Sequence, residues 1–220
     1  MSILVEAAVE SLADALAAVD GGADRLELCA ELREGGTTPA ARLIEDVLDR
    51  VDVPVMVMIR PRGGNFVYTM HELDTMRRDI ELVRELDADG IVLGVLDARN
   101  EVDVYRCREL MDMADGLPVT FHRAFDRIVD QAHALESLIE LGITRVLTSG
   151  GADTAERGID QLRDLVEAAD GTISILAGGG VRDQNVAEIV RETGVPEVHL
   201  RCEGDAERIR RVKNVLAFDD

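Results

Sequence analysis

Short apolar runs alternate with longer amphipathic stretches along this chain, and the pattern repeats eight times. The runs span residues 3–9, 25–29, 54–59, 91–96, 118–122, 145–148, 172–177 and 197–200. Each run has the length of a strand and is nearly continuously apolar, as is typical of parallel strands buried on both faces. We therefore expect eight strands of a parallel sheet.

The stretches between the runs carry apolar residues at i, i+3 and i+4 spacing, which predicts helices. The clearest cases are residues 12–19, 43–48 and 135–141, and a last helix is expected over about 205–215. Gly22, Gly142 and Gly194 follow predicted helices and suit the left-handed conformation that ends a helix.

Eight strand–helix units predict a closed (β/α)8 barrel. A chain of 220 residues suits one such domain over residues 1–220, because these barrels occupy ~200–250 residues. The barrel is nearly minimal, with no linker or low-complexity tract in the sequence. A doubly wound open sheet is the alternative.

The composition indicates in which cellular compartment this barrel is expected. No run of eighteen apolar residues occurs, so no transmembrane segment is expected. The first residues lack a basic region and read as a strand, so a cytoplasmic protein is expected rather than a secreted one. Three scattered cysteines without CxxC spacing, Cys29, Cys107 and Cys202, argue against a disulfide framework and a structural zinc site.

The net charge is −20, from 44 acidic and 24 basic residues, and Lys213 is the only lysine. So negative a chain repels nucleic acid and anionic lipid, because phosphate binding needs basic surface. The acidic residues are spread along the chain, which predicts an acidic folded surface. We interpret it as adaptation to a salt-rich, halophilic cytoplasm, with an ordinary acidic protein as the alternative.

Ligand sites in such barrels lie at the carboxyl ends of the strands. Glu27 and Cys29 close the second run and point to one side of the strand, with Leu28 on the other. A carboxylate in a strand is costly unless it is paired, so Glu27 is expected at the polar mouth. A salt bridge at the barrel rim is the alternative role.

Two arginines and two glycines follow the third run. Arg60 and Arg62 flank a proline, and the guanidinium fork suits a carboxylate or phosphate. This segment is a candidate anion clamp. One of the two arginines can instead pair with Glu27, so a mixed role is expected.

His122 ends the fifth run and is followed by Arg123 and Asp126. A histidine at a strand end is a natural general acid or base near neutral pH. A lone histidine is more often a core residue, but its charged neighbours favour a functional role. Glu27, His122 and Asp126 are the candidate catalytic residues, and Arg123 is a candidate substrate ligand.

Glycine-rich turns follow the sixth and seventh runs. The first contains Ser149 and Gly150, and the second contains Gly178 and Gly179. Backbone amides in such turns can cradle a phosphate, although tight turns use glycine for other reasons. These four residues are candidate phosphate ligands.

His199 lies in the last run, and barrel closure brings that strand beside the first. His199, Glu6 and the Glu27–Cys29 pair are therefore expected in one sector of the mouth. Imidazole, thiolate and carboxylate together can ligate a metal. His199 is also a candidate substrate ligand.

The sequence resembles the CutC family over roughly residues 3–200. The similar segments are residues 22–30, 34–39, 59–68, 120–126, 145–150, 177–182 and 197–199, in the same order. The resemblance implies a TIM barrel, a cytoplasmic location, self-association as a dimer or tetramer, and a role in copper homeostasis. It also implies a Cu(I) site of two cysteines at the ends of the first two strands.

Cys29 matches the second of these cysteines and is the candidate metal ligand. The segment Glu6-Ala7-Ala8-Val9 stands where family members carry the first. Two hypotheses follow: a copper-binding protein, or an enzyme that acts by acid–base catalysis on a small anionic substrate such as a phosphorylated sugar or carbonyl compound. The sequence leaves open whether the protein is an enzyme.

Overall fold

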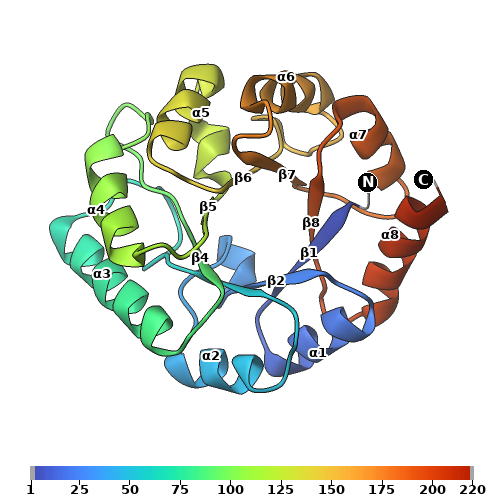
Figure 1. Cartoon of the computed structure of the whole chain (residues 1–220), viewed down its shortest axis with the longest axis horizontal. Helices are drawn as coiled ribbons and strands as arrows, with labels where there is room; N and C mark the ends of the chain where they lie inside the picture. The colour runs from blue at the N-terminus through green and yellow to red at the C-terminus, as the bar shows by residue number, and fades with distance from the viewer. Residues whose placement is uncertain (1–2, 219–220) are drawn as a thin grey trace.

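A computed structural model describes residues 3–218 of the chain as a closed barrel of eight parallel strands in chain order, each followed by a helix (Figure 1). The barrel closes between β1 (Leu4–Val9) and β8 (Glu197–Arg201), which are paired from Leu4 opposite Glu197 to Ala8 opposite Arg201. The predicted (β/α)8 barrel is confirmed. The open-sheet alternative is wrong because β1 and β8 are hydrogen-bonded neighbours.

The other strands and the helices have the following bounds. The strands are β2 (Arg25–Leu28), β3 (Val55–Met58), β4 (Gly90–Leu93), β5 (Val119–Phe121), β6 (Arg145–Thr148) and β7 (Ser174–Gly178). The helices are α1 (Leu12–Asp20), α2 (Ala41–Leu48), α3 (Met70–Glu85), α4 (Val104–Ala114), α5 (Gln131–Glu140), α6 (Ile159–Ala169), α7 (Val186–Thr193) and α8 (Ala206–Phe218). Short 3-10 helices, η1 (Leu32–Glu34) and η2 (Arg123–Arg127), follow β2 and β5.

Each predicted apolar run overlaps an observed strand, and β6 has the predicted bounds. The three glycines expected to end helices adopt the left-handed conformation, with φ of +90° at Gly22, +78° at Gly142 and +71° at Gly194. Only a residue without a Cβ takes these angles freely. The left-handed conformation predicted for these three glycines is therefore confirmed.

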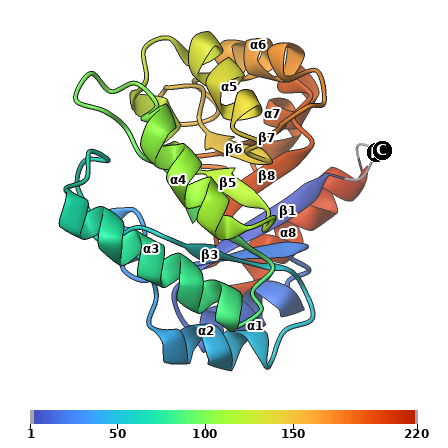
Figure 2. The same cartoon turned by 60° about the vertical axis from the view of Figure 1, so that its left-hand side comes forward.

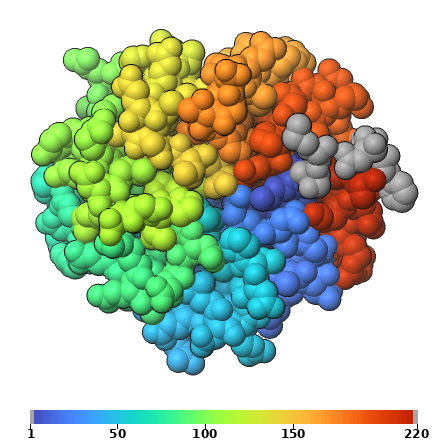
Figure 3. All heavy atoms as spheres, in the orientation of Figure 1, coloured from blue at the N-terminus to red at the C-terminus, as the bar shows by residue number. Residues whose placement is uncertain are grey.

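The outer faces of the strands form the main core with the helices, as expected for strands covered by helices. Figure 2 shows α3 and α4 side by side on the outside of the barrel. Figure 3 shows the successive units as colour sectors around the molecule, with the first unit beside the last. No helix among residues 3–218 has both the length and the apolar character needed to span a membrane.

The inside of the barrel is divided into a polar and an apolar part. At the amino ends of the strands, Arg25 pairs with Glu6 and Glu197, and Arg145 Nε donates to Glu197 Oε2 at 2.6 Å. Above this buried ionic network lies a small apolar cluster, separate from the main core, made of Ala8, Cys29, Leu32, Met56, Met58 and Val92. This set, called the sulfur cluster below, lies under the mouth.

Candidate functional site

A cavity of about 790 Å³ opens at the carboxyl ends of the strands. Its volume lies in the range of small-molecule sites, ~300–1,000 Å³. The lining includes Glu27, Met58, Arg60, Phe66, His122, Arg123, Asp126, Leu147, Gly179, Gly180, His199 and Arg201. Residues predicted from separate strand ends thus share one cavity.

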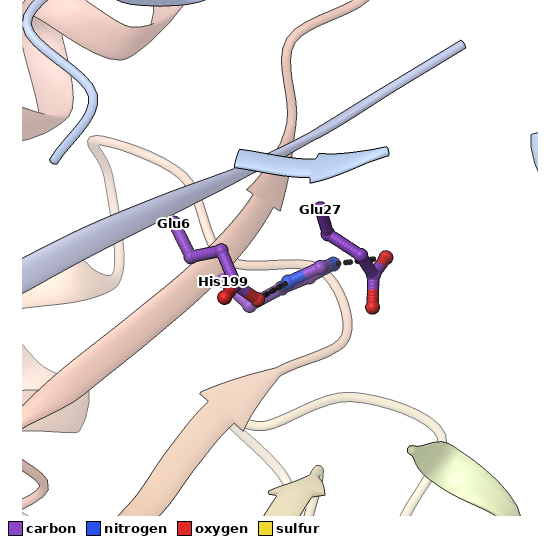
Figure 4. Close-up of side chains that lie close together, drawn as sticks. All are labelled: Glu6, Glu27 and His199. Atoms are coloured by element: carbon purple, nitrogen blue, oxygen red, sulfur yellow. Dashed lines mark hydrogen bonds and ion pairs between the residues drawn. The ribbon is translucent and has the colours of Figure 1, made fainter. Parts of the chain in front are cut away.

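His199 lies between two glutamates at the floor of this cavity (Figure 4). Its Nδ1 is 2.8 Å from Glu6 Oε1, and its Nε2 is 3.7 Å from Glu27 Oε2. One ligand atom from each of the three residues lies within 4.8 Å of the others, so the group could hold a metal ion. The predicted gathering of β1, β2 and β8 in one sector of the mouth is confirmed.

The three groups differ in their proton affinity. Burial alone would raise the pKa of Glu6, but the hydrogen bond with His199 and the charge of Arg25 lower it to about 2. Burial would lower the pKa of His199, yet the charges of Glu27 and Glu6 outweigh it and raise that pKa. Burial raises the pKa of Glu27. The two carboxylates therefore favour the protonated form of His199, and Glu6 stays ionised beside it.

Cys29 adjoins this group through Glu27. Its Sγ donates a hydrogen bond to Glu27 Oε2 over 3.5 Å, and the side chain is fully buried. Burial and the neighbouring Glu27 carboxylate raise the pKa of the Cys29 thiol well above its usual value. Cys29 is therefore a neutral thiol in the protein without metal.

Met56 and Met58 pack in the sulfur cluster with Cys29 inside the barrel. Gly36, with φ of +85°, lies against both Cys29 and Met58. A Cβ at position 36 would be 3.1 Å from Cys29 Sγ and 3.3 Å from Met58 Cε. Met56 and Met58 are each 2% exposed. Met56 is paired with Glu27 across β2 and β3, and Cys29 and Met58 lie two residues nearer the mouth, so the sulfur-containing side chains adjoin the carboxylate–imidazole group inside the barrel.

Arg60 is buried and holds loops rather than a carboxylate. Its Nη1 donates to the carbonyls of Glu34 and Gly36 at 3.0 and 2.8 Å, and its Nη2 donates to the carbonyl of Gly64 at 3.0 Å. The Phe66 ring lies 4.9 Å from the guanidinium carbon. The expected pairing of an arginine from this segment with Glu27 is wrong, because both guanidinium groups are engaged elsewhere.

Arg62 lies outside the cavity lining. It forms a salt bridge with Glu72 Oε1 at 2.5 Å and donates to the carbonyls of Asn65 and Val67 at 2.8 and 3.0 Å. It therefore fastens the β3–α3 loop, and the structure does not bring it together with Arg60 as a clamp. The loop so fixed carries Phe66 to the mouth, where its ring centroid is 4.9 Å from that of His122.

His122 is held in one tautomer. Its Nδ1 accepts a hydrogen bond from the backbone N–H of Ala124 at 3.2 Å, so the neutral ring carries its proton on Nε2. Burial and the charge of Arg60 lower the pKa of His122 to about 3. Nε2 has no partner within residues 3–218. His122 is thus a neutral N–H donor near pH 7.

Asp126 organises the loop after β6. Its Oδ1 accepts hydrogen bonds from Thr148 Oγ1 at 2.5 Å and from the amides of Ser149 and Gly151 at 3.0 and 3.2 Å, and its Oδ2 pairs with Arg123 Nε at 2.7 Å. The carboxylate is fully engaged, which favours a structural role over the predicted proton transfer.

The two glycine-rich turns differ in what their amides offer. The amides of Ser149 and Gly151 bind Asp126, and the amide of Gly150 donates to Thr148 Oγ1 at 2.9 Å, so the first turn has none to spare. Gly178 ends β7, where a Cβ would lie 2.5 Å from Leu147 Cδ1. Gly179 lines the cavity.

Several lining residues were not singled out from the sequence: Phe66, Arg127, Gly180, Arg201 and Arg208. Strand alternation was the available signal for Arg201, which lies two residues after His199 and shares its inward side. The others stand on loops, on the short helix η2 or on α8, where strand alternation gives no direction.

Comparison with known proteins places these features in a family. A model described as the CutC family matches residues 3–204. The human copper homeostasis protein cutC homolog is 43% identical over 96% of this chain and 77% of its own, and a family protein CutC of Histophilus somni is 47% identical over 89% of this chain and 81% of its own.

Solved structures agree. A crystal structure assigned to the copper homeostasis protein CutC of Streptococcus agalactiae is 39% identical, covers 94% of this chain and 99% of its own, and superposes with a TM-score of 0.87. Thiamine phosphate pyrophosphorylase of Pyrococcus furiosus reaches a TM-score of 0.67 at 15% identity, over 98% of this chain and 96% of its own. At that identity the likeness shows a shared fold alone.

Proposed function

The chain belongs to the CutC family, and we propose that it serves copper homeostasis by binding a copper ion at the floor of the barrel mouth. The human and Streptococcus agalactiae relatives are named for copper homeostasis. The observation that carries the proposal is the Cys29 thiol, which belongs to the sulfur cluster and donates a hydrogen bond to Glu27, the neighbour of His199.

The donor chemistry of this floor fits Cu(I). Soft sulfur ligands select Cu(I), and imidazole also suits copper. Cys29 would be the principal ligand, with Met58 of the sulfur cluster and His199 as candidates for further sulfur and nitrogen ligands. The hydrogen bond from Cys29 to Glu27 supports the assignment, because the carboxylate is in place to accept the proton that a metal-bound thiolate gives up.

An anaerobic Cu(I) titration against a chromophoric Cu(I) chelator tests this proposal. The Cys29→Ser variant should bind Cu(I) at least about a hundredfold more weakly than the wild type, because even residues that only orient a metal ligand are worth about 10- to 100-fold. Cys107→Ser is the matched control, since Cys107 is equally buried but donates to Val95 O from α4. Equal affinities of the wild type and Cys29→Ser would overturn the proposal.

Restoring the missing cysteine gives a second, independent test. Ala8 belongs to the same sulfur cluster as Cys29, so Ala8→Cys places a second thiol inside the barrel. Two thiolates should bind Cu(I) more tightly than one. Ala7→Cys is the control, because Ala7 packs in the main core outside the barrel. Tighter binding by Ala7→Cys, or by neither variant, would contradict the location.

An enzyme acting on a small anionic substrate by acid–base catalysis is the second candidate. Two buried polar atoms favour it, Glu27 Oε1 and His122 Nε2, because neither has a partner in the described part of the chain and both residues line the cavity. Glu27 would transfer the proton and His122 would polarise a carbonyl as a neutral donor.

A thermal-shift screen of phosphorylated sugars and carbonyl compounds tests this candidate. A ligand at 100 times its Kd stabilises the folded state by about 2.7 kcal/mol. A hit whose turnover is lost in Glu27→Gln supports catalysis. A broad panel without stabilisation contradicts it.

We propose a salt-rich cytoplasm, supported by the net charge of −20, and self-association as a dimer or tetramer. Exposed apolar side chains at the beginnings of α3 and α4, Met70, Val104 and Tyr105, support self-association. Sedimentation of the wild type and of Tyr105→Arg at molar salt tests it, with a monomeric wild type as the contradicting result.

A further inference from the structure

The charge balance of the cavity is the reverse of that of the whole chain. Five arginines line it against four carboxylates, whereas the chain has 24 basic and 44 acidic residues. A cleft with low-dielectric walls focuses the field of the charges that line it. The mouth is therefore the place where this acidic protein can attract an anion.

Arg60 is the buried arginine of this lining. It is 3% exposed, and no carboxylate lies within 4 Å of its guanidinium among residues 3–218. Its bonds run to backbone carbonyls, and its Nε has no partner there. A buried charge without a counter-ion is costly, and a bound anion in the cavity would relieve that cost.

Arg123 supplies a positioned donor on the other side of the cavity. Its Nε is fixed by Asp126 Oδ2 at 2.7 Å and its Nη2 by Ser149 Oγ at 2.8 Å, so the guanidinium has one orientation. The remaining nitrogen, Nη1, lies against Gly179, where a Cβ would come within 3.2 Å of it. Glycine at 179, with φ of +99°, is what lets the arginine reach the loop.

The loop after β7 offers free amides beside this arginine. In contrast to the amides of the β6 loop, the backbone N–H groups of Gly179, Gly180 and Val181 donate no hydrogen bond within the part of the chain that the structure describes. Gly179 and Gly180 both line the cavity and have positive φ, +99° and +75°. Free amides next to a fixed guanidinium match the donors that an oxyanion requires.

We propose that this side of the mouth binds the oxyanion group, phosphate or carboxylate, of a small organic metabolite. Arg123 Nη1 and the amides of Gly179 and Gly180 are its donors, and Arg60 supplies the uncompensated positive charge. The cavity of about 790 Å³ leaves room for the organic part of the ligand, which the apolar side chains of Met58, Phe66 and Leu147 would contact.

An NMR titration of the ¹⁵N-labelled protein tests the site, with inorganic phosphate, succinate and chloride added at constant ionic strength. The amide signals of Gly179 and Gly180 should shift and saturate with phosphate or with succinate, but not with chloride. Saturation with phosphate alone assigns a phosphate ligand, and saturation with succinate alone assigns a carboxylate. Arg123→Gln should weaken the binding at least about tenfold, as expected for a lost charge-assisted hydrogen bond.

Matched variants keep the test decisive. Arg163→Gln on α6 removes a half-buried arginine outside the cavity and should leave binding unchanged. Arg208→Gln, which removes a cavity arginine whose salt bridge runs to Glu203, should weaken binding even where Arg123→Gln disturbs the loops. No response from either anion, or equal affinities in the wild type and both cavity variants, would overturn the proposal. Cys29→Ser should bind the anion normally, so this result is independent of copper.

Discussion

At the scale of single residues, the surroundings of His122 inside the barrel determine its protonation state. The side chain is 4% exposed, its Nδ1 accepts from a backbone amide, and the charge of Arg60 faces it. An imidazolium would have to give up that hydrogen bond and sit beside another cation. The expectation of a general acid or base is therefore replaced by that of a neutral hydrogen-bond donor.

This environment gives His122 a measurable effect on stability. Its folded-state pKa of about 3 lies below the unfolded value of about 6.5. The unfolded chain thus binds an extra proton between these values, so stability is complete above about pH 6.5 and falls with decreasing pH by about 1.4 kcal/mol per unit. Urea unfolding between pH 4.5 and 7 should show a shallower slope for His122→Asn than for the wild type. His133→Gln, at an exposed histidine, should keep the wild-type slope, and equal slopes in all three proteins would refute the assignment.

Whether a side chain points into or out of the barrel is predictable from the sequence where the alternation of a strand applies. Glu27 and Cys29 point into the barrel and Leu28 points out, as the two-residue period requires. The partners of Arg62 and Asp126 were not predictable, because each is satisfied by loop backbone or by a residue on another element. Such pairings depend on how loops pack, and no local periodicity encodes them.

At the scale of elements, Asp126 joins two loops of the mouth. It stands on η2 after β5, and it receives hydrogen bonds from Thr148 and from two amides of the loop after β6. The same carboxylate orients Arg123 toward the β7 loop. Three neighbouring strand ends are thereby held in one arrangement.

Asp126→Asn should loosen this arrangement. The amide lacks the charge that pairs with Arg123 and cannot accept on both sides, so a loss of about 2 kcal/mol is expected. For a domain of this size that lowers Tm by about 4–8 °C. Calorimetry and hydrogen exchange of the Ser149–Gly151 amides measure both effects. Asp153→Asn is the control, because Asp153 lines the same mouth but pairs with Arg157 in an exposed salt bridge, and it should change Tm little. An equally small change of Tm in Asp126→Asn would contradict the role of Asp126 in holding the loops together.

At the scale of the whole molecule, the acidic surface and the basic mouth oppose each other. A net charge of −20 repels itself at low ionic strength. Screening shortens the range of that repulsion from about 10 Å at 0.1 M salt to about 3 Å at 1 M. The compact fold should therefore depend on salt, although its contacts stay the same.

Thermal unfolding in potassium chloride measures this dependence. Tm at pH 7.5 should rise by at least about 5 °C between 0.1 and 2 M salt, equivalent to about 2 kcal/mol for a domain of this size. Near the isoelectric point of about 4.5 the rise should be much smaller, because the net charge is then close to zero. A Tm at pH 7.5 that stays constant or falls with salt would contradict a surface adapted to a salt-rich cytoplasm.

X-ray absorption at the copper edge is the most direct test of the proposed binding of copper through Cys29 at the floor of the mouth. Cu(I)-loaded wild type and Cys107→Ser should both show sulfur as the dominant ligand, and Cys29→Ser should lose most of that sulfur scattering. Spectra that are the same in the wild type and Cys29→Ser, or sulfur ligation that is lost in Cys107→Ser, would contradict the claim.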